Sequence, residues 1–567
     1  MRGTPRSKSG NYTHAHCGWR WVNVVLALGA LVGTSTGCAL IYGLDGYSIS
    51  SDDAGSPLEG QDSSTDPDAD VESDTSSPTE PDSATTYVDA APPGCVSHAE
   101  CAALATSAGQ DDATICVRAT GQCVPLRTED CPTVFGDYKN ENAIVLGALV
   151  KSGSNLTFER SVFLAAEEIN SAGVPARNAG GSPRPLVIVS CDPGAALMRA
   201  TRHLAEDLHV PAIVGPLSDG AVIEATQQVT SKSGTLLLSP SAQSSSVTNL
   251  SDNDLTWRNV TSDTQRAKLL IDQVNDLETL LRSTRTVTSV KLGVVHQNDA
   301  RGLSVRDSIG GKLLLNGRFM NDPFNAGFVS IDAYAMPGDA AAKAIVTKYT
   351  RTFTPDIVLV TSEDQIHNLI VPLEAALTAA RATVKPYYIC TDAAKTKTLL
   401  DAIAVGGLPA DIRRRIRGIG AKPSSASEST LAAFAAAYAA KNGALTDPIA
   451  SAPAYDATYA IAAAIAATPS TEPSGASVAE GLRRLGVGAP MSVGANLVQG
   501  MLTEAARGSI SLRGTLSIMR WDSNGDVLDG TLEVWCIGRA VVPTFGSSGR
   551  TMEVQSQVVG GGFIQCQ

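Results

Sequence analysis

From residue 142 onward, short apolar runs rich in β-branched residues alternate with longer segments in which apolar residues recur every three or four positions. The short runs predict strands, and the longer segments predict helices. Strands this apolar are buried on both faces, as in parallel sheets that lie between layers of helices. The pattern therefore predicts an α/β fold with two sheets. The expected strands are 143–149, 186–190, 212–214, 235–238, 290–295, 357–361 and 387–389, and the expected helices are 160–169, 195–208, 220–231, 263–281, 302–315, 340–352 and 364–380.

The C-terminal part of the chain follows a different pattern. Residues 427–441 and 454–467 are rich in alanine and predict two further helices. Residues 511–537 then form two alternating runs around Asn524-Gly525, which is a strong sequence signal for a β-hairpin.

The same turn also fits part of a calcium-binding loop. The ligand positions one, three, five and twelve of such a loop are filled by Asp522, Asn524, Asp526 and Glu533. The sixth position requires glycine, but here it is Val527, and strands rather than helices are expected on both sides. We therefore predict a hairpin and no metal site at this turn.

The N-terminus has the composition of a secretory signal. Four basic residues and no acidic residue precede position 38, and a largely apolar run covers 21–32. This run is too short to cross a hydrocarbon layer of roughly 30 Å, and no later segment offers about 18 uninterrupted apolar residues. We expect a signal peptide over 1–37 and no integral membrane domain.

The end of this segment, Ser35-Thr36-Gly37-Cys38, resembles a bacterial lipobox, in which a cysteine is diacylated and becomes the mature N-terminus. The resemblance implies lipidation of Cys38, although Ser35 replaces the usual leucine or valine. The alternative is ordinary cleavage beside a chance cysteine. By analogy with lipoprotein sorting in Gram-negative bacteria, Ala39 indicates the outer membrane, so we expect a location in the cell envelope, either periplasmic or at the cell surface.

Residues 38–93 are predicted to form a disordered acidic linker. Between 45 and 92 there are 13 Asp and Glu residues and no Lys or Arg, with too few apolar groups to offset the entropy of ordering. This tract accounts for the net charge of −13, since the chain outside it and the signal peptide sums to −4. A near-neutral body argues against bulk nucleic-acid binding, which requires clustered basic residues.

Clustered cysteines in an exported chain predict disulfides. Five of the 11 cysteines lie within 94–131, which predicts a small module with two bridges and leaves the three pairings of four cysteines open. A metal site is disfavoured because no close Cys-x-x-Cys pair is present and His98 is the only nearby histidine. Proximity and parity suggest two more pairs and leave Cys390 free. The disulfide candidates are Cys95, Cys101, Cys116 and Cys123, with Cys131 pairing onward to Cys191 and Cys536 to Cys566.

An ordered series of segments carries a family resemblance: 143–170, 191–218, 236–244, 453–466 and the turn 521–526. Together they are similar to the type I periplasmic (solute) binding proteins, above all to the branched-chain amino-acid (Leu/Ile/Val) substrate-binding proteins of ABC transporters. The resemblance covers 142–540 and implies two Rossmann-like lobes joined by a hinge, preceded by the cysteine-rich module and the linker, with ligand held between the lobes. It assigns 142–265 and 415–510 to lobe 1, 266–414 and 511–540 to lobe 2, and 541–567 to a C-terminal tail.

The resemblance implies that two loops of lobe 1 contact the ligand. Ser218 and Asp219 follow the strand 212–214 and open a helix, whose free N–H groups and dipole favour a ligand carboxylate. The alternative is that Ser218 only caps this helix. The second loop lies where the family has a Ser-Pro-x-x-Thr sequence, with Gln243 in place of the threonine, and its candidate ligand-binding residues are Ser241, Ala242, Gln243 and Ser244.

In lobe 2, Asp392 matches the acidic residue with which the family binds the ligand α-ammonium. Its alternative role is to cap a helix that starts near residue 393. Glu363, also a ligand-binding candidate, stands where the family usually has an aromatic residue over the ligand, and Ala300 stands where a tyrosine is common. Because both departures remove apolar lining, the ligand is expected to be more polar or cationic than leucine.

The resemblance implies a lipid-anchored extracytoplasmic protein that captures an amino-acid-like small molecule for an ABC permease. It is expected to act as a monomer, without cofactor, metal or nucleic acid, and to contact the membrane only through its anchor. The linker and the cysteine-rich module also fit a ligand-sensing receptor ectodomain, or a surface interaction lipoprotein with a degenerate cleft. An enzyme is not expected, because the chain lacks the His-Glu-x-x-His and Gly-x-x-x-x-Gly-Lys-Ser/Thr motifs.

Overall fold

The computed structural model describes residues 94–560 except 152, 154, 177–180 and 339. The predicted signal peptide, the lipidation site Cys38 and the acidic linker therefore lie outside the described residues. Among the helices of the described ranges, none combines the length and the apolar character needed to cross a membrane.

The described chain begins with a small disulfide-bonded module. Helix α1 (His98–Ser107) precedes an antiparallel pair of strands, β1 (Thr114–Val117) and β2 (Gln122–Pro125). One disulfide joins Cys95 to Cys116, and a second joins Cys101 to Cys123. The structure thus confirms the prediction of two disulfides within this module and shows which cysteines pair.

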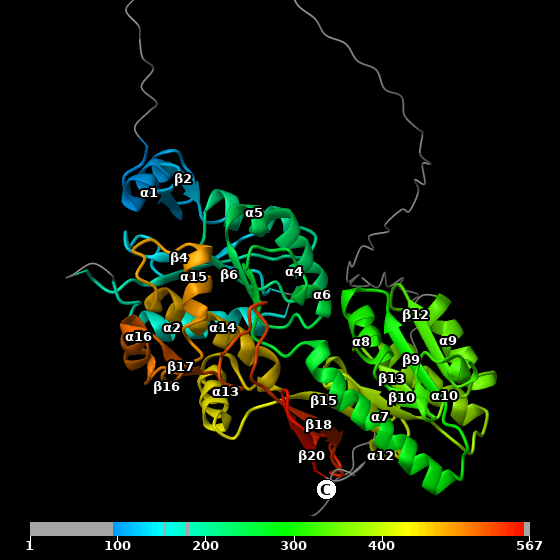
Figure 1. The fold of residues 1–567 in the computed structure, drawn as a ribbon. Helices are drawn as coiled ribbons and strands as arrows, with labels where there is room; N and C mark the ends of the chain where they lie inside the picture. Colours follow the sequence, from blue (N-terminus) through cyan, green and yellow to red (C-terminus); the bar gives the residue numbers. More distant parts are fainter. Residues whose placement is uncertain (1–93, 152, 154, 177–180, 339, 561–567) are drawn as a thin grey trace, which may run out of the picture. The chain divides into compact units, whose positions relative to one another are not determined.

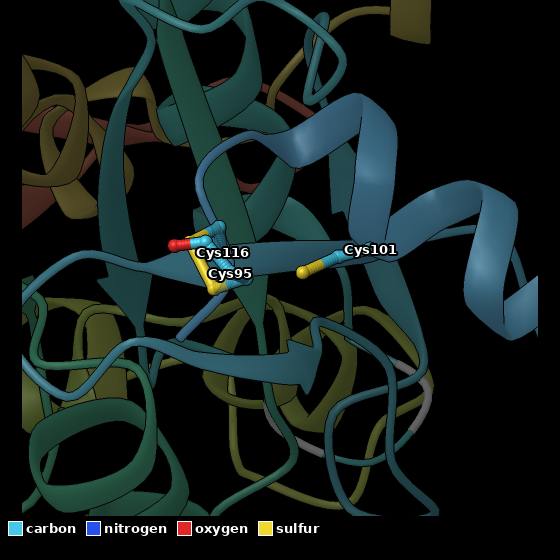
Figure 2. Close-up of side chains that lie close together, drawn as sticks. All are labelled: Cys95, Cys101 and Cys116. Carbon is cyan, nitrogen blue, oxygen red and sulfur yellow. A yellow bond between two sulfur atoms is a disulfide. The ribbon is translucent and has the colours of Figure 1, made fainter. Parts of the chain in front are cut away.

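Three sulfur atoms of this module lie within 4.8 Å of one another, those of Cys95, Cys101 and Cys116 (Figure 2). Such a cluster resembles a metal site in geometry. However, each of the three sulfurs is part of a disulfide, and metal ligation by cysteine requires a free thiolate. The cluster is therefore a cross-link and not a metal centre.

A third disulfide, Cys131–Cys191, ties the module to the first of two large sheets. Strand β3 (Thr133–Phe135) follows directly and pairs antiparallel with β5 (Leu186–Ser190) at the edge of this sheet. The sheet therefore begins before residue 142, where the sequence analysis placed its start. The predicted pair Cys536–Cys566 involves Cys566, which lies outside the described residues.

The first sheet has six strands within the described ranges, in the order β3-β5-β4-β6-β7-β8. Every pairing except that of β3 is parallel, as the apolar strand pattern predicts. The other strands are β4 (Ile144–Ala148), β6 (Ala212–Val214), β7 (Leu236–Ser239) and β8 (Thr256–Arg258), and the intervening helical segments are α2 (Thr157–Asn170), α3 (Leu197–Arg202), η1 (His203–Asp207), α4 (Asp219–Ala225), η2 (Thr226–Thr230), α5 (Ser231–Ser233) and α6 (Ser245–Thr248).

Helix α14 (Pro448–Ala467) forms the centre of the helical layer on this sheet. It is buried from Ser451 to Ala467, because its alanines let neighbouring helices approach closely on every side. It packs beside α2 (Figure 1), and Gly481 of the next helix lies so close that a Cβ there would stand 2.2 Å from the Ala464 oxygen. The surrounding elements are α13 (Glu428–Asn442), α15 (Gly475–Leu482), α16 (Val498–Arg507) and the parallel pair β16 (Ala489–Ser492) and β17 (Ile510–Arg513).

The second sheet has eight strands in the described part of the chain, in the order β12-β9-β13-β14-β15-β18-β19-β20. The pairings from β12 to β15 are parallel, and those from β15 to β20 are antiparallel. The strands are β9 (Leu292–Gln297), β12 (Val329–Tyr334), β13 (Ile357–Val360), β14 (Tyr387–Cys390), β15 (Ile416–Lys422), β18 (Thr531–Ile537), β19 (Phe545–Glu553) and β20 (Val558–Val559). The helices of this lobe are α7 (Asp263–Arg285), α8 (Ala300–Gly310), α9 (Ala340–Arg351), η4 (Ile366–Ile370), α10 (Val371–Ala379), η5 (Asp392–Ala394), α11 (Lys397–Ala404) and α12 (Ile412–Arg415). Between α8 and β12 lie a separate antiparallel pair, β10 (Leu314–Leu315) and β11 (Arg318–Phe319), and the short helix η3 (Pro323–Gly327).

The two-lobe α/β prediction is confirmed, but the predicted lobe boundaries need correction. Within the described residues the chain passes between the sheets after β8, after β15 and before β18. Residues 415–422 belong to lobe 2 rather than lobe 1, because β15 pairs with β14 and β18. Gly418 permits this arrangement, since a Cβ at that position would stand 2.0 Å from the ring of Trp535.

Two C-terminal predictions are also wrong. The described part of the predicted tail, residues 541–560, is not a simple tail, because β19 and β20 extend the second sheet and Phe545 packs edge-on against Trp535 at 5.3 Å. Residues 511–528 belong to lobe 1 rather than lobe 2. Leu512, Trp521 and Val527 lie in the core over the first sheet.

The predicted hairpin is present only as a short turn. Trp521 and Val527 form an antiparallel bridge, and Gly525 sits at φ 73° against Trp257. The longer runs on either side separate, since β17 pairs with β16 and β18 pairs with β15. The turn serves to pack lobe 1: the Trp521 indole N–H donates to the Arg258 carbonyl oxygen at 2.7 Å.

Candidate functional site

Side chains from both lobes meet where loops leave the carboxyl ends of strands. Gln243 comes from the loop after β7, Arg301 from the first turn of α8 after β9, and Asp392 from the start of η5 after β14. Arg301 Nη2 donates to Gln243 Oε1 and to Asp392 Oδ1, each at 2.6 Å. Gln243 Nε2 donates to Asp392 Oδ2 at 2.9 Å. These three residues form a closed polar bridge between the lobes.

Asp392 is further held by Arg266 of α7, whose Nη1 lies 2.9 Å from Asp392 Oδ1. Burial alone would raise the pKa of Asp392, but Arg266, Arg301 and the Gln243 amide together hold it well below its usual range. For Arg301 burial alone would lower the pKa, and the carboxylates around it raise it instead. Both groups are therefore ionised at neutral pH.

Asp219 occupies the lobe 1 side of the cluster. It is buried, and its Oδ1 accepts hydrogen bonds from the backbone N–H groups of Gln243 and Ser244, each at 2.6 Å. Burial raises the pKa of Asp219, against the opposing charge of Arg301 and these hydrogen bonds. The pair of N–H groups is thus an anion-binding site that a carboxylate of the chain itself fills.

A third carboxylate, Asp263, stands at the first position of α7. Its backbone N–H donates to the backbone carbonyl oxygen of Gln243 at 2.8 Å. Ser262, the residue before it, makes a capping box with Gln265. Burial raises the pKa of Asp263 to about 6, with Arg301 opposing the shift and Asp219 adding to it. Its Oδ2 is buried and has no hydrogen-bond partner within the described residues.

The space beside this cluster is small. A cavity of about 10 Å³ adjoins Asp263 and Arg266, which is room for about one water molecule. As the lobes stand in this structure, this cavity does not accommodate a small-molecule ligand. The remaining lining residues are Ala267, Leu270, Val305, Ser308, Ile309, Thr391 and Ile419.

A buried ion pair supports the loop that carries Gln243. Arg258, fully buried at the end of β8, pairs with Asp526 of the 521–527 turn at 2.6 Å. Its Nη1 donates to the Ser244 carbonyl oxygen at 2.7 Å, and Asp526 Oδ2 accepts from Thr248 at 2.8 Å. Asp526 is therefore engaged in an ion pair, which agrees with the rejection of a calcium loop.

The structure brings some of the predicted site residues into the cluster and leaves others beside it. Ser218 caps α4, since its Oγ accepts from the Ala221 N–H at 3.3 Å, as the alternative in the sequence analysis has it. Ser241 Oγ donates to the Leu217 oxygen, and Ala242 is buried in a small apolar cluster. Ser244 Oγ donates to the Ala300 oxygen at 3.1 Å, which makes a second contact between the lobes.

Glu363 does not join the cluster. Its side chain is exposed and accepts a hydrogen bond from Thr398 Oγ1 at 2.6 Å. It follows β13 by three residues, and its partner Thr398 belongs to α11 of lobe 2. The prediction that Glu363 faces the ligand is therefore not supported by its contacts.

Sequence reasoning missed three members of the cluster, Arg301, Arg266 and Asp263. Arg301 directly follows Ala300, a position that the sequence analysis considers only because the family commonly has a tyrosine there. Asp263 and Arg266 lie three residues apart at the start of a predicted helix, which places them on one face. A search for charged residues in the first turn after each predicted strand or crossover would have found all three.

Gly302 allows α8 to begin close to the end of β9 and so positions Arg301. A Cβ at Gly302 would stand 2.1 Å from the backbone oxygen of Gln297. Gly302→Ala is expected to lower the free energy of unfolding by about 1–3 kcal/mol, because backbone atoms have to move apart. Urea denaturation measures the change. The control is Gly311→Ala at the other end of α8, where an added Cβ would have no described residue within 4 Å other than the two adjacent in the chain. An equal loss of stability in both variants would contradict the explanation given for Gly302.

Comparison with solved structures finds this fold in the branched-chain amino acid transporter substrate binding protein LivJ from Streptococcus pneumoniae, in complex with isoleucine. The match covers 71% of this chain and 99% of that chain, with 17% identity and a TM-score of 0.50. A periplasmic binding protein type 1 from Bordetella pertussis matches over 72% and 99%, with 15% identity and a TM-score of 0.50. No protein-family model matches the chain, and a search of the curated proteins finds no match. The fold is that of the type I periplasmic binding proteins.

Proposed function

We propose that this chain, with its type I periplasmic-binding-protein fold, is an extracytoplasmic solute-binding protein that holds an amine-bearing small molecule between its lobes. One observation carries the proposal: the Asp392 carboxylate, after a lobe 2 strand, meets the Gln243 amide, after a lobe 1 strand, at 2.9 Å. Ligands of open α/β sheets bind outside the carboxyl ends of strands. An ionised Asp392 in this position attracts an ammonium or guanidinium group.

The cellular context is part of the same proposal and rests on the sequence. Lipidation at Cys38 would anchor the chain in the cell envelope, and the acidic linker would hold the cysteine-rich module and the two lobes away from the membrane. The solute is then passed to an ABC permease. The binding of a small solute is supported by the similar LivJ structure, a transporter substrate binding protein in complex with isoleucine.

A second candidate function is that of a surface interaction protein whose cleft is degenerate. It is favoured by the small cavity of about 10 Å³ and by Arg301, which already neutralises Asp392. In that case the lobes would form one rigid body, and no small molecule would change their stability.

Differential scanning fluorimetry of the full chain against amino acids, diamines and small organic anions separates the two. A bound ligand at 100 times its Kd stabilises the folded state by about 2.7 kcal/mol. Asp392→Asn is expected to abolish this stabilisation, because the variant lacks the charge that pairs with the amine. The matched control is Asp307→Asn, an exposed carboxylate on α8 that pairs with its neighbour Arg306. A shift that survives Asp392→Asn would refute the proposed site, and no shift with any compound would favour the second candidate.

A further inference from the structure

The interlobe cluster contains both a cation and an anion that belong to the chain itself. The Arg301 guanidinium contacts Asp392 Oδ1 and Gln243 Oε1, each at 2.6 Å. The Asp219 carboxylate accepts from the N–H groups of Gln243 and Ser244, each at 2.6 Å. These are the contacts that the two poles of a zwitterionic ligand would otherwise make.

The two internal groups differ in how easily they leave. Asp219 has a short side chain, is 5% exposed, and sits at the first position of α4 directly against the N–H pair. Arg301 has a long side chain that is 23% exposed, and it lies in the first turn of α8. Its Nε is buried without a hydrogen-bond partner among the described residues, so its guanidinium is only partly satisfied. Of the two internal groups, Arg301 is therefore the one that a ligand would displace more easily.

Departure of Arg301 leaves an excess of negative charge. The carboxylates of Asp219, Asp263 and Asp392 then face one remaining guanidinium of the cluster, that of Arg266. Arg258 also lowers the pKa of Asp219, but the charge of Arg258 is balanced by its partner Asp526. The loss of a guanidinium from among these acidic groups favours an incoming cation and opposes an incoming anion.

We propose that Arg301 is an internal ligand that holds the lobes together in the absence of solute, and that the solute is an amine or guanidine that replaces it. Because Asp219 retains the N–H pair of Gln243 and Ser244, the solute needs no carboxylate. The proposal rests on the proposed function for the existence of a solute, but the role of Arg301 is testable without knowing that solute. Arg301 is in this sense the residue that determines the ligand class.

The test is chemical replacement of the missing side chain in Arg301→Ala of the full chain. Ethylguanidinium, putrescine and propionate are each titrated calorimetrically, at millimolar concentrations that do not denature. Ethylguanidinium is expected to bind Arg301→Ala roughly tenfold or more tightly than the wild type, because it no longer has to break two charge-assisted hydrogen bonds. Propionate is expected to bind neither protein. Arg306→Ala, which removes a guanidinium one turn and a half further along α8, is expected to behave as the wild type.

Small-angle X-ray scattering gives an independent readout. Arg301→Ala is expected to show a larger radius of gyration than the wild type, and ethylguanidinium is expected to restore the smaller value. Equal ethylguanidinium affinity in wild type and Arg301→Ala, or preferential binding of propionate, would overturn the proposal. If Arg301→Ala does not fold alone, folding that depends on added ethylguanidinium supports the proposal, and Arg301→Gln, which keeps a hydrogen-bonding group without the charge, decides the case by the same titration.

The outcomes distinguish this inference from the proposed function. Wild-type protein that no compound of the fluorimetry panel stabilises, together with an Arg301→Ala variant that binds ethylguanidinium, would count against the solute-binding function and retain the internal ligand. Wild-type protein that binds amino acids only when both ammonium and carboxylate are present would retain the function and refute the inference.

Discussion

Replacing Arg258 by methionine is expected to lower the free energy of unfolding by about 3–5 kcal/mol. The change leaves the Asp526 carboxylate buried without its partner, and an uncompensated buried charge is costly. It also removes the donor to the Ser244 carbonyl oxygen, at the loop that carries Gln243. Guanidinium chloride denaturation, followed by tryptophan fluorescence, measures the loss.

The control for this effect is an ion pair at the surface. Arg520→Met breaks the ion pair between Arg520 and Asp529, in which the two side chains are 48% and 30% exposed. It should lower the free energy of unfolding by no more than about 1 kcal/mol. The double variant Arg258→Met with Asp526→Asn should recover part of the stability, because the orphaned charge is gone. A loss in Arg258→Met no larger than that in Arg520→Met would show that the buried pair does not support the site loop.

The second large effect concerns pH and Asp456 in the centre of α14. Burial raises the pKa of Asp456 to about 7, although both its oxygens accept hydrogen bonds from Thr515. Because the folded chain binds this proton more tightly than the unfolded chain, Asp456 contributes stability at pH 4 and loses it as pH rises through 7. At 1.36 kcal/mol per pKa unit the loss is on the order of 4 kcal/mol.

Asp456→Asn keeps the shape of the protonated acid and cannot ionise. The variant is therefore expected to match the wild type near pH 4 and to be more stable above pH 8, by up to about 4 kcal/mol. Urea denaturation of both proteins at several pH values gives the comparison, and subtracting the two curves removes the other titrating groups. Parallel curves would mean that Thr515 holds Asp456 ionised throughout.

Seven strands of the two parallel ladders could be predicted from the sequence because each is a continuous apolar run, whereas β8, β12 and β15, which also pair in parallel, could not. Strand 186–190 was placed at its observed bounds, β5 (Leu186–Ser190). Strand β15 was not found, since Ile416–Lys422 contains an arginine, a lysine and two glycines and has no apolar run of its own. Its place in the sheet depends on Trp535, which lies across Gly418 and comes more than one hundred residues later. Such a contact leaves no local pattern.

The candidate site divides in the same way. Asp219, Gln243 and Asp392 could be identified because each follows a predicted strand at a position that the family resemblance marks. Arg301 could be found only as a charged residue after a strand, because nothing in the sequence shows that its side chain reaches Asp392, 91 positions away. The chemistry of the cluster depends on this contact between residues distant in sequence and not on any local motif.

The order in which the two sheets receive their strands has a consequence for synthesis. The core of lobe 1 needs α14, and the second sheet needs β18 between β15 and β19, so both cores depend on late segments of the chain. A nascent chain that ends before residue 531 has neither β18 nor the strands after it. It therefore leaves one edge of β15 unpaired and leaves Gly418 without the Trp535 ring that covers it. Lobe 2 therefore completes its sheet only when β18 is present, and a chain without β18 is expected to be more open to proteases.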